Sequence, residues 1–218
     1  MALISHPLDR LPPGATMHAV TAIPDRIDGK PSLRVELADA VTTQGTPGID
    51  YVDMPTFVRI PTRLGTGTID VSIWSRLNNK TSFDSRAFAG IAYRIADDLS
   101  SFEAVYLRPL NGLTLEPDPP RSQRAVQYFA YPDWKFDRLR EQFPDGRFES
   151  AADIAPARWI DLRLTIAESS VTVFVDGGEV LHVDETRGQA GTGDVGLFVD
   201  IGTEAFFADL RIETEHWG

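Results

Sequence analysis

The sequence contains no cysteine among its 218 residues. This absence excludes disulfide bonds, thiolate zinc sites and cysteine nucleophiles. The four histidines, His6, His18, His182 and His216, are scattered, and no two of them stand at the spacing of metal ligands. We therefore expect neither a histidine-based metal site nor a catalytic triad that includes histidine.

Lysine is scarce, and the chain is acidic. Only Lys30, Lys80 and Lys135 are lysines among 21 basic residues, and the formal net charge is −11. Such a charge repels phosphate backbones and anionic lipid headgroups, so we expect no nucleic-acid partner and no membrane partner. The sequence also lacks a run of about 18 apolar residues and a basic, then apolar, leader at its start. These absences predict a cytoplasmic protein.

Apolar residues recur at a period of two along much of the chain, which is the pattern of half-buried β-strands. We expect strands at 17–23, 33–37, 56–60, 68–74, 87–95, 102–108, 124–130, 159–166, 171–175, 179–183, 195–199 and 205–213. One short helix is predicted over 134–143. This content indicates an all-β protein, and the length fits a single domain over 1–218 with an irregular lead-in at 1–15.

The segment VTVFVDGGEVLHV, residues 171–183, is typical of a β-hairpin. Asp176, Gly177 and Gly178 supply the positive φ angles that a tight turn between two strands requires. Glycines and a PDPP run at 117–120 interrupt the other strands, so most connections should be short loops.

Several motifs occur in order between residues 68 and 212. They read FAGIAYRI from Phe88, YLRP from Tyr106, AVQY from Ala125, FES from Phe148 and GTEAFF from Gly202. This block resembles the concanavalin A-like lectin and glucanase superfamily, and within it the laminin G-like or 3-keto-disaccharide hydrolase-type domains. The resemblance implies a jelly roll of two antiparallel sheets, one of them concave with a groove for sugar.

Strand alternation predicts which side chains meet in that groove, because residues two apart share one face. Small residues at Gly90, Ala92, Ala104 and Ala125 leave room on that face. The groups expected to bind substrate are Arg94, Arg108, Gln127, Trp134 and Tyr131. Arginine and glutamine donate and accept hydrogen bonds with sugar hydroxyls, and aromatic rings stack on the apolar face of a pyranose. The alternative is that Arg94 and Arg108 simply pair with Glu103, Glu149, Asp97 or Asp98.

Catalytic candidates are few. Laminarinase-type and lichenase-type members carry carboxylates in the order E-x-D-x-(x)-E on one strand, and this pattern is absent here. Glu149, which follows a long loop, and Tyr106 are the residues we expect to perform acid–base chemistry, although Glu149 is also suited to a structural salt bridge. A set of Arg, Tyr, Gln and Glu side chains resembles in kind the groups used by polysaccharide lyases. In such a site Arg or Gln would neutralise a uronate carboxylate while Tyr takes a proton.

The sequence therefore favours a carbohydrate-active protein, a hydrolase or a lyase acting on a glycoside or oligosaccharide. A non-catalytic carbohydrate-binding or protein-interaction sandwich is the alternative, since the paired carboxylates are missing. We expect no cofactor, with Asp200 and Glu204 as the candidates should calcium bind. A homodimer through a sheet edge or the convex face is a further expectation.

Overall fold

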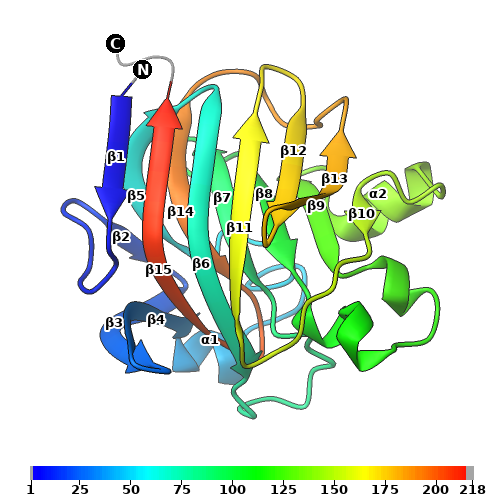
Figure 1. The fold of residues 1–218 in the computed structure, drawn as a ribbon, viewed down its shortest axis with the longest axis horizontal. Coiled ribbons are helices and arrows are strands. Elements are labelled where there is room, and N and C mark those ends of the chain that lie inside the picture. The colour runs from blue at the N-terminus through cyan, green and yellow to red at the C-terminus, as the bar shows by residue number, and fades with distance from the viewer. Residues whose placement is uncertain (1, 215–218) are drawn as a thin grey trace.

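The computed structural model describes residues 2–214, so His216 lies outside the described residues. Two antiparallel β-sheets lie one over the other (Figure 1). The predicted fold class, an all-β two-sheet jelly-roll sandwich, is confirmed. Within the described part of the chain, no helix has the length and apolar character needed to cross a bilayer.

The first sheet has eight strands in the order β13-β12-β11-β6-β15-β4-β3, and β1 also pairs with β15. Their bounds are β1 Ala2–His6, β3 Val20–Ile27, β4 Lys30–Leu37, β6 Gly67–Leu77, β11 Trp159–Ile166, β12 Val171–Val175, β13 Gly178–Val183 and β15 Thr203–Thr214. The second sheet has seven strands in the order β10-β9-β8-β7-β14-β5-β2. Their bounds are β2 Thr16–His18, β5 Phe57–Leu64, β7 Ala89–Ile95, β8 Phe102–Leu107, β9 Val126–Tyr131, β10 Glu149–Ser150 and β14 Gly193–Val199.

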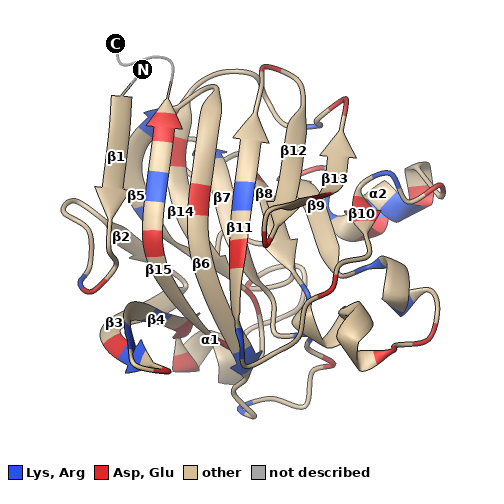
Figure 2. Ribbon diagram, viewed as in Figure 1, with Lys and Arg blue, Asp and Glu red and all other residues tan. Residues whose placement is uncertain are grey.

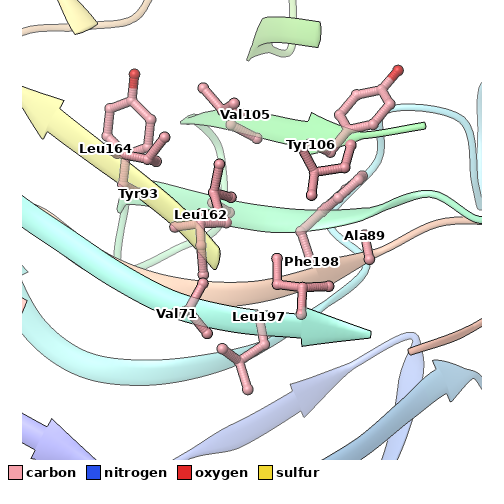
Figure 3. Close-up of a cluster of buried hydrophobic side chains, with 14 of the residues drawn as sticks. Val71, Ala89, Tyr93, Val105, Tyr106, Leu162, Leu164, Leu197 and Phe198 are labelled. Carbon is pink, nitrogen blue, oxygen red and sulfur yellow. The ribbon is translucent and has the colours of Figure 1, made fainter. Parts of the chain in front are cut away.

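The core lies between the sheets. Val71 and Leu162 from the first sheet belong to one buried cluster with Tyr93, Val105 and Leu197 from the second (Figure 3). Alternate residues of β11 are buried and exposed, as expected for a sheet with one face in water. Strands β7 and β8 are instead buried at every position, so both faces of the second sheet are covered around these two strands.

Loops and the short helix at 136–142 cover the outer face of the second sheet, where the helix lies against β9. Helix α1 spans Asp39–Gln44 and helix α2 spans Phe136–Gln142, close to the helix expected at 134–143. Single turns of 3-10 helix lie at Pro109–Asn111, Leu113–Leu115 and Arg121–Gln123. Residues of α2, of the turns at 109–111 and 121–123, and of the loops around 52–53 and 83–88 line the cavity described below.

Two local predictions have clear outcomes. The hairpin at 171–183 is confirmed, because β12 and β13 pair and Asp176 and Gly177 have φ of 47° and 83°. The irregular lead-in at 1–15 is wrong for residues 2–6, which form β1 and pair with the last strand. Leu3 is exposed while Ala2 and Ile4 are half-buried, so this edge strand is held by backbone pairing and leaves a weak hydrophobic signal.

Candidate functional site

A cavity of about 340 Å³ lies on the outer side of the second sheet, where β8 ends. This volume lies within the range of small-molecule pockets. The lining combines arginines, carboxylic acids and aromatic rings: Val52, Asp53, Phe83, Asp84, Arg86, Phe88, Tyr106, Arg108, Asn111, Arg121, Arg124, Phe136, Arg140 and Asp200.

Arg108 follows β8 directly and is the buried centre of the site. Its Nη2 donates to the Tyr106 hydroxyl at 2.8 Å and to the Gln127 Oε1 at 3.0 Å. Its Nη1 donates to Glu149 Oε1 at 2.6 Å. Tyr106 and Gln127 are directly opposite each other on β8 and β9, and Glu149 is opposite Gln127 on β10. The sheet register therefore sets the geometry of this network.

Glu149 is shared by three arginines. Besides Arg108, Arg140 donates from Nε and Nη2 at 2.8 and 2.5 Å, and Arg124 Nε lies 3.5 Å away. Burial acts to raise the pKa of Glu149, but the hydrogen bonds from Arg140 and the charges of Arg108 and Arg140 outweigh it and hold the pKa below its usual value. A carboxylate that stays ionised and is bonded on both oxygens is a poor proton donor.

Asp200 holds a strained turn against the end of β14. Its carboxylate accepts hydrogen bonds from the backbone N–H groups of Val52, Asp53 and Ile201, at 3.0, 3.0 and 2.7 Å. Val52 and Asp53 have φ of 71° and 54°, a left-handed conformation that is unfavourable for a β-branched valine. The role of Asp200 is thus to position Asp53, which is 147 residues away in the sequence.

Asp53 is a buried acid of the cavity with a raised pKa. Its Oδ2 accepts from the Phe136 N–H at 2.8 Å, and its Oδ1 has no hydrogen-bond partner in the described chain. Burial and the negative charge of Asp200 raise the pKa of Asp53 to about 7, against the lowering effects of the Phe136 N–H, Arg108 and Tyr106. Asp53 is therefore protonated in a substantial fraction of molecules near neutral pH and can donate a hydrogen bond to a ligand.

Aromatic and amide groups complete the cavity. Phe88 packs edge-on against Tyr106 at 5.9 Å between ring centroids, and the Arg140 guanidinium lies 4.7 Å from the centre of the Phe136 ring. Asn111 is buried, and its Oδ1 also lacks a partner among residues 2–214. Burial raises the pKa of Tyr106 well above its usual value, so this hydroxyl keeps its proton. The cavity thus offers aromatic faces beside polar atoms that are free to bind.

No protein-family model and no curated protein matches the sequence. Solved structures do match. A carbohydrate-binding module, CBM66 from Bacillus subtilis, superposes with a TM-score of 0.57 at 13% identity and covers 90% of this chain and 97% of its own. A β-1,3-1,4-glucanase (lichenase) derived from a mouse hindgut metagenome has a TM-score of 0.56 at 10% identity, with coverage of 99% and 100%.

The chain has the concanavalin A-like jelly-roll fold. A protein of unknown function with a galectin-like fold from Bacillus subtilis is also similar, with a TM-score of 0.59, 10% identity and coverage of 97% and 94%. At such low identity these likenesses establish the fold alone. The narrower resemblance to laminin G-like or 3-keto-disaccharide hydrolase-type domains stays a prediction.

Of the residues predicted from sequence, the jelly roll brings Tyr106 and Arg108 to the cavity and places Gln127 and Glu149 behind Arg108. Gln127 is fully buried, and its Nε2 donates to backbone carbonyls of Tyr128 and Phe148, so it orients Arg108 and does not line the cavity. The pairing of Arg108 with Glu149, weighed as the alternative, is present.

The prediction that Arg94 points toward the same face as Tyr106 and Arg108 is wrong. Arg94 has φ of 51°, and the pairing of β14 with β7 shifts register beside it, so the side chain turns away from the cavity. It instead bonds Glu103 at 2.8 Å and the backbone carbonyls of Gly65 and Ala167. This pair is buried, so Arg94 ties loops at one end of the sandwich together.

The open groove expected over Gly90, Ala92 and Ala104 is also wrong. These positions are buried, because aromatic side chains on the same face fill the room that the small residues leave. The rings are Phe57, Phe102, Phe129 and Phe198, together with Tyr106.

The two predicted stacking platforms are used for packing. Tyr131 stacks on Phe102 with centroids 5.1 Å apart. Trp134 packs between Phe143 and the guanidinium groups of Arg138 and Arg187. Neither lines the cavity. The aromatic residues there are Phe83, Phe88, Tyr106 and Phe136, and the spacing of Phe136 and Arg140, four apart on the predicted helix, is the signal that would have found two of the lining residues.

Asp200 and Glu204 do not form a calcium site together. Asp200 is occupied by backbone N–H groups, whereas Glu204 pairs with Arg76 at 2.6 Å on the first sheet. Among residues 2–214, no group of three or more histidine, aspartate or glutamate side chains is arranged to hold a metal.

A second hollow of about 510 Å³ lies on the outer face of the first sheet. Acidic and basic residues lie near one another there on β6, β11 and β15 (Figure 2). Arg163 and Asp70 pair at 2.5 Å, and both side chains are partly exposed. This hollow is larger, but it is lined by exposed charged residues of both signs, and Phe174 is the one aromatic side chain among its lining residues. The smaller cavity is the better candidate, because it holds buried polar atoms that have no hydrogen-bond partner in the described chain.

Proposed function

We propose that this protein binds a carbohydrate in the cavity at the end of β8. The observation that carries the proposal is the combination of unpartnered buried oxygens on Asp53 and Asn111 with the aromatic faces of Phe88 and Phe136. The hydroxyl groups of a sugar can form hydrogen bonds with these oxygens, and its apolar C–H faces can pack on the aromatic rings. Several proteins of similar fold are named as carbohydrate-binding modules or glucanases, which supports the proposal.

The binding groups are held in place before a ligand arrives. Asp200 fixes the turn that carries Asp53, and Glu149 and Gln127 fix Arg108. A site that is rigid in the free protein loses less entropy on binding, which favours affinity for small polar ligands.

A thermal-shift screen against sugars, uronates and glycosides tests the proposal. A ligand at about a hundred times its Kd should stabilise the protein by about 2.7 kcal/mol, which raises Tm by about 5–10 °C for a chain of this size. The shift should be lost in Phe136→Ala, whose ring lines the cavity. It should persist in the matched Phe174→Ala variant, whose ring lines the outer hollow. A shift that both variants keep would place the sugar elsewhere.

Catalysis by Asp53 is a second candidate. A carboxyl group with a pKa of about 7 and a free oxygen in a cavity is suited to donate a proton to a glycosidic oxygen. The partner carboxylate of a two-acid glycosidase is not supplied by Asp200 or Glu149, because both are bonded to other groups. The test is product release from the sugar that binds, with Asp53→Asn expected to reduce the rate by about 100-fold or more. Equal rates in both proteins would exclude Asp53 as the acid.

A further inference from the structure

The cavity carries an excess of positive charge inside an acidic protein. Five arginines line it, whereas the carboxyl groups in or beside it are Asp53, Asp84, Glu149 and Asp200. The arginines therefore exceed the carboxylates by one charge, and by another in molecules where Asp53 is protonated. The chain as a whole has a net charge of −11, so this local excess opposes the overall field.

The excess arises because the arginines share acceptors. Arg108, Arg124 and Arg140 all pair with the single carboxylate of Glu149. Arg86 and Arg121 in turn share Asp84. Each guanidinium has five N–H donors in a planar fork. Arg108 also donates to Tyr106 and Gln127, and Arg86 to the Ser85 carbonyl, so the unused donors lie mainly on the other arginines.

Among the five arginines, Arg121 and Arg124 are the most available to bind a ligand. Arg121 contacts Asp84 at 3.3 Å and Arg124 contacts Glu149 at 3.5 Å, and their side chains are 58% and 32% exposed. Burial and the like charges of Arg140 and Arg108 lower the pKa of Arg124, while Glu149 opposes this effect. An added anion would relieve the repulsion among these arginines.

We propose that the cavity selects a sugar that carries an anionic substituent, which Arg121 and Arg124 bind while Asp53 and Asn111 bind its hydroxyl groups. This inference rests on the proposed function and adds the class of sugar to it. Arginine binds carboxylate, sulfate and phosphate through paired, charge-assisted hydrogen bonds, so the three substituents share the same recognition chemistry.

Titration calorimetry with matched sugars tests the inference. Glucuronate is compared with glucose, galacturonate with galactose, and glucose 6-phosphate and glucose 6-sulfate with glucose, each at about 20 and about 200 mM salt. We expect the anionic member of at least one pair to bind about tenfold more tightly at low salt, and this preference to shrink at high salt. The order among uronate, sulfate and phosphate identifies the substituent.

The variant Arg121→Gln/Arg124→Gln should lose the preference for the anionic sugar. Both side chains are partly exposed, so the fold is expected to survive, which the melting curve verifies. The matched control is Arg163→Gln on the outer face of the first sheet, whose side chain is 56% exposed and pairs with one aspartate. It should keep the preference.

The results distinguish a failure of this inference from a failure of the proposed function. Equal binding of anionic and neutral sugars, or binding of neutral sugars alone, would overturn the inference and leave the proposed function standing. A preference that Arg163→Gln removes as strongly as the double variant would also overturn it. Binding of no sugar in any pair would overturn both.

Discussion

Replacing Asp53 with asparagine should remove a large part of the pH dependence of stability. The pKa of Asp53 is about 7 in the folded protein, compared with a reference value of 3.8. Between these values the unfolded chain has lost the proton and the folded protein keeps it. Deprotonation therefore favours the unfolded state, and this residue lowers stability progressively as pH rises from about 4 to about 7.

The magnitude follows from the two pKa values. Where the unfolded chain has lost a proton that the folded protein keeps, each rise of one pH unit costs about 1.4 kcal/mol of stability. Between pH 5 and pH 8, Asp53 should therefore lower the free energy of unfolding by about 2 to 3 kcal/mol. Asparagine has nearly the same shape, keeps an acceptor for the Phe136 N–H, and does not titrate.

The assay is urea unfolding of the wild type and Asp53→Asn at several pH values from about 5 to about 8. The difference in free energy of unfolding between the two proteins should change by about 2 to 3 kcal/mol in favour of the variant as pH rises. Asp118→Asn, at an exposed loop position, is the control and should run parallel to the wild type. Parallel curves for Asp53→Asn as well would refute the placement of a protonated acid in the cavity.

Three further predictions concern the surrounding framework. Glu149→Gln leaves the Arg108 charge buried without its carboxylate and should lower the free energy of unfolding by about 3 kcal/mol, measured by urea titration; a loss below about 0.5 kcal/mol would contradict the network. Arg94→Met should destabilise by a similar amount but leave sugar affinity unchanged in calorimetry below the melting point, because Arg94 lies outside the cavity; reduced affinity would contradict its placement. Gly90→Ala would press its Cβ against the Val105 carbonyl oxygen, so its melting temperature should fall by more than about 5 °C, and an unchanged value would argue against the close approach of β7 and β8.

The strands were predictable because their signal is local. Alternation located β6, β11, β12 and β15 to within a few residues, and the DG pair located the hairpin turn. Strand β1 was missed because an edge strand with a half-exposed face shows little periodicity. The short helix α1 was missed for a related reason, since none of its residues is buried.

The site was predictable where strand register alone determines it. Tyr106, Gln127, Arg108 and Glu149 lie on neighbouring strands or directly after one, and the structure brings these four together. Arg94 was misplaced because a β-bulge reverses the face of a side chain, and a bulge leaves no clear mark in one sequence.

The position of Asp53 in the cavity could not be predicted from the sequence. Its place depends on three backbone hydrogen bonds to Asp200, one of them from its own N–H, and on a left-handed turn at a valine and an aspartate. Such long-range contacts between loops follow from the packed fold and from no local pattern. The same holds for Phe88 and Asn111, which look like ordinary core or loop residues in the sequence.

A crystal structure with the sugar that gives the largest thermal shift tests the central claim most directly. We predict a sugar ring against Phe136 or Phe88, with a hydroxyl group within hydrogen-bond distance of Asp53 Oδ1 or Asn111 Oδ1. A sugar bound instead in the outer hollow, beside Asp70 and Arg163, would contradict the assignment of the cavity at the end of β8.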